Sequence, residues 1–313
     1  MPRYLLRRFL AAIPVLFLVS LMSFAVIWLV PGDPAAAFLD ASASQEQVAR
    51  VREELGLNQP LPRRMLQWYG RVLTGDLGQS ILLQRSVTQA IVERLPVTLS
   101  LAALALVLAA LLGIGAGIVA AMHRGGHADR TVMTASLLGL SMPDFWLGLV
   151  LIVVFAVGLG WLPSGGYVPI TESFTGWLRT MTLPALTLAL VQTGFIARMT
   201  RSAMLDVLHQ DFIRTADAKG LSHGYVVLRH GLPNAMMPIL TVLGIIAGSL
   251  LGGAVVVEQV FSLPGVGRLI IGAIMSRDFP VIQGGMLFLA AVFVLVNLLV
   301  DLLYAAVDPR VRL

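Results

Sequence analysis

The sequence predicts an all-α polytopic membrane protein with six transmembrane helices and a small extracytoplasmic insert after the first helix. Of its 313 residues, 57% are hydrophobic and only 12% are charged, and the mean hydropathy is +0.85. Several apolar runs reach about 18 residues or more, the length that a helix needs to cross a bilayer. This composition excludes an ordinary soluble domain.

Several classes of chemistry are excluded by what the chain lacks. It has no cysteine, which rules out disulfides, iron–sulfur clusters and thiol catalysis. Its net charge of +5 comes from arginines at the ends of apolar runs, so no basic face for nucleic acid is expected. The single lysine, Lys219, is not followed by Ser or Thr, so the chain has no phosphate-binding loop of its own. We expect no catalytic residues and no metal site, since glycines separate the histidine pair His123 and His127.

The first apolar run, about residues 9–30, follows Arg3, Arg7 and Arg8. It is too long for the core of a signal peptide, so we expect an uncleaved helix whose N-terminus is cytoplasmic. The organisation that we expect is a transmembrane helix over 1–30, an extracytoplasmic domain over 31–95, and a five-helix core over 96–313 with a cytoplasmic loop at 205–233.

The polar insert predicts two short helices. Ser44 and Gln47 form a capping-box pattern for a helix that runs through Glu54. A second amphipathic helix over about residues 60–73 carries Trp68 and Tyr69, which we assign to packing at the membrane surface instead of a substrate role.

Four further apolar runs, at about residues 97–122, 183–203, 236–257 and 286–307, predict unbroken helices. In the first of these, Gly113 and Gly117 form a small-xxx-small face that suits close helix contact. The remaining run, about residues 132–159, is interrupted near Pro143, which removes a backbone donor and breaks the helix.

Polar and small residues within these helices predict a substrate path. Asp144 follows the predicted break, and a carboxylate at that depth faces protein or water instead of lipid. The alternative is that Asp144 only caps the broken helix. Glycines at a spacing of four, Gly244, Gly248 and Gly252, indicate either a smooth wall for cargo or close helix packing. Our candidates for the path are Ser141, Asp144, Gln192, Gly248 and Gly252.

The polar stretch from residue 211 to 238 separates two of these helices. It predicts a short amphipathic helix with Phe212, Ile213 and Ala216 on one side, a break at Gly220, and a second helical piece. Small residues at Ala216 and Ala218 leave the exposed side shallow enough to enter a groove on another protein.

This stretch resembles the cytoplasmic coupling loop in the permease subunits of ABC importers. Their consensus is Glu-Ala-Ala, three residues, Gly, nine residues, Ile, one residue and Leu-Pro. With the glycine at Gly220, Leu232-Pro233 matches the final pair, whereas Arg214 and His230 depart from the consensus. The run Arg-Thr-Ala-x-Ala-Lys-Gly-Leu is similar to the form of the dipeptide/oligopeptide branch, B-type subunit.

Other segments extend the resemblance. The sequences PGDP, LGLNQPLP and GDLGQS resemble the first extracytoplasmic region of this branch, and Ser-x-Pro-x-Phe-Trp around Pro143 is similar to the third helix. The family usually has a small or apolar residue at the position of Asp144. The segment from Glu258 to Gln283 also resembles the family, in which a loop here reaches toward the substrate-binding protein. The resemblance therefore implies contact residues Phe261, Leu263, Pro264 and Gly265.

The resemblance implies the type I ABC importer permease fold and a function in ATP-driven import, in which this chain forms half of the translocation pathway. The implied partners are a second, non-identical permease subunit, two ATPase subunits that bind ATP and Mg, an extracytoplasmic substrate-binding protein and membrane lipid; this chain itself would bind no cofactor. The implied coupling residues are Arg214, Thr215, Ala216, Asp217, Ala218, Lys219, Gly220 and Leu221.

Di- and oligopeptides are the cargo that the resemblance favours, and similar permeases carry nickel or glutathione. A different class remains open, a proton-coupled secondary transporter that uses Asp144, Glu258 and Asp301. Charge sets the orientation: twelve basic residues lie on the side of the termini and the coupling loop, against three in the short opposite loops. The positive-inside rule then predicts a multi-pass protein with both termini in the cytoplasm. The resemblance implies that the membrane is the bacterial inner membrane.

Overall fold

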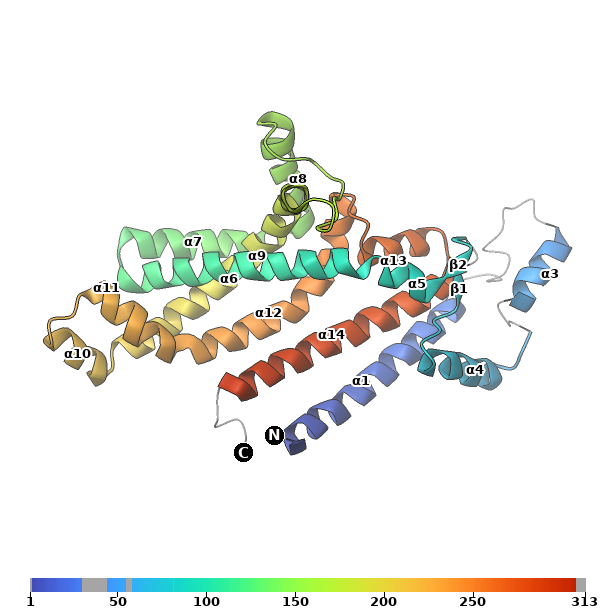
Figure 1. The fold of residues 1–313 in the computed structure, drawn as a ribbon, viewed down its shortest axis with the longest axis horizontal. Coiled ribbons are helices and arrows are strands. Elements are labelled where there is room, and N and C mark those ends of the chain that lie inside the picture. The colour runs from blue at the N-terminus through green and yellow to red at the C-terminus, as the bar shows by residue number, and fades with distance from the viewer. Residues whose placement is uncertain (1, 30–43, 55–57, 81, 308–313) are drawn as a thin grey trace. The chain divides into compact units, whose positions relative to one another are not determined.

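The computed structural model describes residues 2–29, 44–54, 58–80 and 82–307 (Figure 1). These residues form two compact units. The larger unit holds residues 98–263 and 296–307, and the smaller unit holds residues 2–97 and 264–295. The PGDP sequence at residues 31–34 and both chain ends lie outside the described residues.

Five unbroken helices in the described ranges are long and apolar enough to cross a membrane, and with a bent helix pair counted as one span there are six. The five are α1 (Pro2–Leu29), α6 (Leu95–Met122), α9 (Phe174–Leu208), α12 (Leu232–Val260) and α14 (Phe279–Val307). The bent pair consists of α7 (His127–Ser141) and α8 (Asp144–Leu151), and the latter continues as a π-helix, η1 (Ile152–Gly158). The predicted polytopic six-helix class is confirmed.

The bend in the third span lies at Pro143, where the sequence predicts it. The direction of the chain bends by 107° between α7 and the helix that follows it. Met142, the residue before the proline, is extended with φ −90° and ψ 129°, because the proline ring disfavours the helical conformation at the preceding residue. Pro143 then precedes α8, where its missing N–H costs nothing.

Glycines bring α6 and α7 into close contact with α9. A Cβ built on Gly117 would lie 2.5 Å from Cβ of Thr200, and one on Gly113 would lie 2.6 Å from Cβ of Ile196. On α9 itself, a Cβ on Gly194 would lie 2.6 Å from the carbonyl oxygen of Ser136 in α7. These distances are shorter than any van der Waals contact, so only glycine fits. The predicted helix-contact face of Gly113 and Gly117 is confirmed.

The smaller unit contains α1 and the polar insert. The insert folds into α3 (Gln45–Glu54), α4 (Leu61–Leu73), a hairpin of β1 (Gln79–Ser80) and β2 (Arg85–Ser86), and α5 (Val87–Val92). The two strands are antiparallel, with Gln79 opposite Ser86. The capping box of α3 is reciprocal, because the Ser44 amide donates to Gln47 Oε1 at 2.8 Å and the Gln47 amide donates to Ser44 Oγ at 3.2 Å.

Two hydrophobic contacts hold the smaller unit together. Trp68 of α4 is buried against Phe24 of α1, with 5.7 Å between ring centroids, and the neighbouring Tyr69 hydroxyl lies 2.8 Å from Ser20 Oγ. This packing of α4 on α1 supports a packing role for the aromatic pair. The second is a core built by α5, by α13 (Val266–Met275) and by the start of α14, and its fully buried members include Val87, Ile91 and Val281.

Two segments contain more helix than the sequence indicated. Helix α9 begins at Phe174 instead of near residue 183, because the Ser173 hydroxyl accepts a hydrogen bond from the Gly176 amide and caps it there. The second segment, from Glu258 to Gln283, holds α13. Glu258 itself lies within α12, fully buried, and accepts a hydrogen bond from Thr98.

Candidate coupling site and membrane pathway

The predicted coupling loop is a helical hairpin between α9 and α12 (Figure 1). It consists of α10 (Asp211–Ala218), α11 (His223–Val226) and a π-helical turn, η2 (Val227–Gly231), that leads into α12. The chain reverses at Gly220, whose φ of +81° lies in the left-handed region that favours glycine. The predicted glycine break therefore has a conformational cause.

Three buried side chains hold the two short helices together. Ile213 and Ala216 of α10 pack against Val226 of α11, and Leu208 at the end of α9 covers them. Ala216 is only 9% exposed, so it contributes to this packing instead of to the surface that the sequence assigned to it. Phe212, which was placed on the same side as Ile213, is 40% exposed. The predicted position of Ile213 and Ala216 on one side is confirmed, whereas the placement of Phe212 on that side and the exposed role given to Ala216 are wrong.

The outer surface of the hairpin carries apolar side chains among polar ones. The remaining predicted coupling residues, Arg214, Thr215, Asp217, Ala218, Lys219, Gly220 and Leu221, are all exposed. Leu221 lies at 39% exposure, Tyr225 at 51% and Leu228 at 58%. We call Phe212, Leu221, Tyr225 and Leu228 the hairpin patch. Sequence reasoning missed Tyr225 and Leu228, although large apolar residues in a polar loop were the available signal.

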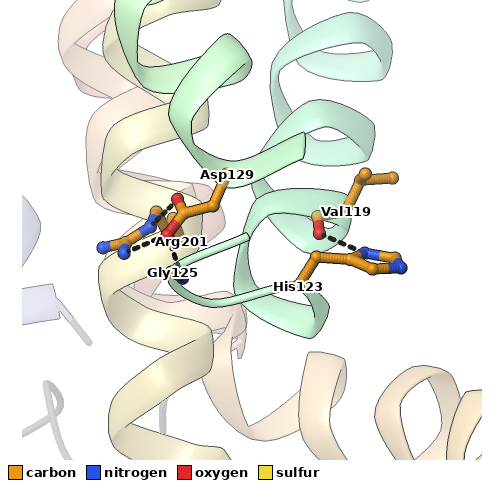
Figure 2. A network of polar contacts seen from close by, with 5 residues as sticks. All are labelled: Val119, His123, Gly125, Asp129 and Arg201. Atoms are coloured by element: carbon orange, nitrogen blue, oxygen red, sulfur yellow. Dashed lines mark hydrogen bonds and ion pairs between the residues drawn. The ribbon is translucent and has the colours of Figure 1, made fainter. Parts of the chain in front are cut away.

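An ion pair at the base of the hairpin joins α7 to α9 (Figure 2). Arg201 donates from Nε to Asp129 Oδ1 at 2.5 Å and from Nη2 to Oδ2 at 2.7 Å. Asp129 also accepts a hydrogen bond at 2.9 Å from the amide of Gly125, in the turn between α6 and α7. The Asp129 side chain is 6% exposed, so this bidentate pair is largely removed from water.

A second polar contact links the same turn to the first residue beyond α9. Arg124 lies 3.1 Å from His209 Nε2, and His209 Nδ1 lies 2.5 Å from the carbonyl oxygen of Leu205. A guanidinium only donates and a carbonyl only accepts, so Arg124 donates to His209 Nε2 and His209 Nδ1 donates to the Leu205 carbonyl. His209 is followed after one residue by α10, so the hairpin is anchored to the α6–α7 turn.

The other arm of the hairpin packs on α9 as well. A Cβ built on Gly231, the last residue of η2, would lie 3.2 Å from Met204 Cε. Met204 belongs to a buried cluster with Val207, Val227, Ala235 and Ile239, which come from α9, η2 and α12. The hairpin is therefore closely packed against both long helices.

The candidate path residues do not all gather in one place. Asp144 lies against α12, since its Oδ2 is 3.3 Å from a Cβ built on Gly253, next to the exposed Gly252. Gly248 is buried within α12, which favours helix packing at that position. Ser141 is exposed and donates to the carbonyl of Leu137 at 3.0 Å, whereas Gln192 is half-buried on α9. The structure thus brings together Asp144 and the Gly252–Gly253 segment.

The turn after α12 is built around buried side chains. Phe261 is 1% exposed and Leu263 is fully buried, while Pro264 remains exposed and Gly265 is buried. The carbonyl of Phe261 accepts a hydrogen bond from the Gly166 amide at 3.2 Å. Of the four residues predicted to contact a binding protein, only Pro264 presents its side chain at the surface. Among the described residues, no group of three or more His, Cys, Asp or Glu side chains could hold a metal ion.

Comparison with models of protein families shows which family the chain belongs to. Residues 113–313 match the model of the binding-protein-dependent transport system inner membrane component, and residues 1–102 match the N-terminal model of the corresponding membrane component. The chain belongs to this family. It is thus a permease component of an ABC transporter, as the coupling-loop pattern indicates.

Relatives match along essentially the whole chain. A protein of Brucella abortus that is named as a peptide transport system permease is 51% identical over 312 residues, covering 100% of this chain and 99% of the relative. The glutathione transport system permease protein GsiC of Escherichia coli K12 is 43% identical over 312 residues, with 100% and 99% covered.

The fold is similar to a solved structure of the inward-facing MetNI methionine ABC transporter. The TM-score is 0.58 at 20% sequence identity, with 70% of this chain and 97% of the other covered. This likeness confirms the type I importer permease fold.

Proposed function

We propose that this chain is one of two non-identical permease subunits of an ATP-driven peptide importer in the bacterial inner membrane. The hairpin patch carries the proposal, because exposed apolar side chains on a loop held by buried packing are suited to a protein partner. Two ATPase subunits would bind ATP and Mg and dock at this patch. An external substrate-binding protein would deliver cargo on the side of the insert, and the excess of basic residues supports a cytoplasmic hairpin.

The mechanism that we propose is alternating access driven through the hairpin. Closure of the two ATPase subunits would displace α10 and α11 as one body, because Ile213, Ala216 and Val226 hold them together. The Met204 cluster and the Asp129–Arg201 pair would pass this displacement to α9, α12 and α7. ATP can shift the permease between its two states only if the ATPase contacts at the hairpin differ between them.

Peptide cargo is proposed from the names of the relatives. The Brucella abortus relative is named for peptide transport and the Escherichia coli relative for glutathione transport. The higher identity, 51% against 43%, favours the peptide system. The competing proton-driven mechanism would have to use Asp144 and Glu258; the side chain of Asp301 lies outside the described residues.

The test is uptake into vesicles that contain the reconstituted transporter and its binding protein. A labelled dipeptide should enter only when ATP is supplied on the hairpin side. Leu221→Glu combined with Leu228→Glu should abolish both uptake and stimulated ATP hydrolysis, because charges in the hairpin patch oppose docking. Leu73→Glu is the matched control, since Leu73 is 86% exposed in the insert. Uptake driven by a proton gradient without ATP would contradict the proposal.

A further inference from the structure

The smaller unit contains a pocket of about 350 Å³ that the coupling mechanism does not use. It lies between α13, the tip of the β1–β2 hairpin and the residues that precede α6. Its walls include Leu82, Leu83, Leu269 and Val281, and two arginines, Arg94 and Arg268, also line it. The volume is at the lower end of the range for small-molecule sites, which begins at about 300 Å³.

The two arginines give the pocket its chemical character. Both line the same pocket, and burial first, then the charges of Arg85 and Arg268, lower the pKa of Arg94, while Glu93 opposes this shift. Nη1 of Arg94 is buried and has no hydrogen-bond partner among the described residues. A buried donor without a partner is unfavourable, so an anion in the pocket that accepts a hydrogen bond from Arg94 Nη1 would relieve this cost.

The nearest carboxylate of the pocket does not fill that role. Asp278 lines the pocket, but it accepts a hydrogen bond from Ser80 Oγ at 2.5 Å and another from the Leu82 amide. No ion pair joins Asp278 to either arginine in the described part of the chain. Asp278 instead holds the tip of the β1–β2 hairpin, where the Leu83 amide donates to Ser80 Oγ at 2.8 Å. The apolar wall of Leu82 and Leu83 is therefore held in place before any ligand arrives.

We propose that this pocket binds the carboxylate at the C-terminal end of a peptide. The proposal rests on the peptide cargo of the proposed function. Guanidinium groups bind carboxylates through two parallel hydrogen bonds, which gives direction as well as attraction. Every peptide carries a terminal carboxylate whatever its sequence, and the leucines beside the arginines suit a variable apolar side chain. A single site of this kind would accept peptides of many sequences.

The experiment measures binding to the assembled transporter in phosphatidylcholine nanodiscs by calorimetry. Tri-alanine should bind, whereas tri-alanine amide, which lacks the carboxylate, should bind about tenfold more weakly, equivalent to about 1.4 kcal/mol. Arg268→Gln should weaken tri-alanine binding by a similar factor and leave the weak amide binding unchanged. Arg268→Lys should show a smaller loss, because it keeps the charge without the fork. The control is Arg277→Gln, an exposed arginine that follows α13 and does not line the pocket.

Three results would overturn the proposal. Equal binding of tri-alanine and its amide would show that the carboxylate is not recognised. Unchanged binding by Arg268→Gln would remove the pocket from the site. Displacement of tri-alanine by inorganic phosphate would assign the arginines to a phosphate. Loss of tri-alanine binding when the transporter is in phosphatidylglycerol nanodiscs would assign them to a lipid headgroup. If the Arg268→Gln transporter keeps its stimulated ATP hydrolysis, the proposed function stands and only the pocket proposal has failed, because hydrolysis depends on the hairpin patch.

Discussion

Replacement of Asp129 by Asn tests whether the ion pair beneath the hairpin stabilises the larger unit. The substitution keeps the size of the side chain but removes its charge and one of the two oxygens that Arg201 binds. Arg201 is 26% exposed, so its uncompensated charge is rehydrated only in part. Removing one partner of a buried pair costs about 3–5 kcal/mol, and we expect about 3 kcal/mol because of that residual exposure.

A double-mutant cycle with Arg201→Gln measures this contribution directly. Unfolding of the purified chain in detergent should show that each single substitution is costly and that the double substitution costs much less than their sum. The coupling free energy should be about 2 kcal/mol, within the range for residues in direct contact. Asp206→Asn on the same helix is the control, since Asp206 is exposed and should shift stability by under about 0.5 kcal/mol. Additive effects of the two substitutions would refute the reasoning.

Two further perturbations follow from the packing and from the burial of a carboxyl group. Gly117→Ala should destabilise the protein by about 1–3 kcal/mol because the added Cβ would overlap Thr200. The control Gly115→Ala, whose added Cβ meets no atom within 4 Å, should be neutral or stabilising. Equal effects of the two substitutions in thermal unfolding would contradict the close approach of α6 to α9. Burial raises the pKa of Asp278, although the hydrogen bond from Ser80 opposes this shift. The folded state then holds a proton on Asp278 that the unfolded chain releases near pH 4. The contribution of Asp278 to the free energy of unfolding is therefore full below about pH 4 and is lost as the pH rises through the folded pKa. Asp278→Asn should flatten that decline, and an unchanged pH profile of the unfolding free energy would remove Asp278 as its source.

Features that depend on neighbours in the sequence could be predicted. Apolar runs located the spans, Pro143 located the bend, and Ser44 with Gln47 located the start of α3. The contact face of Gly113 and Gly117 also follows from spacing alone. In each case the information lies within one helical element and its ends.

Features that depend on distant segments could not be predicted. Asp129 and Arg201 are 72 residues apart, and no local pattern pairs them. Ala216 is buried because α11 folds back on it after Gly220, and that return sets which face of α10 is covered. The burial of Phe261 similarly depends on contacts with the segment around Gly165 and Gly166. Helix periodicity gives the existence of an amphipathic face but not the partner that covers it.

In the proposed mechanism, an ATPase subunit docks on the helical hairpin of α10 and α11. The chain has no cysteine, so one introduced residue provides a unique attachment point. Leu221→Cys, at an exposed position in the hairpin patch, should crosslink to the ATPase subunit in the assembled transporter, with a yield that changes when ATP is bound. Leu73→Cys in the insert should give no such crosslink. A transporter that hydrolyses ATP but crosslinks at Leu73→Cys instead of at Leu221→Cys would contradict the claim.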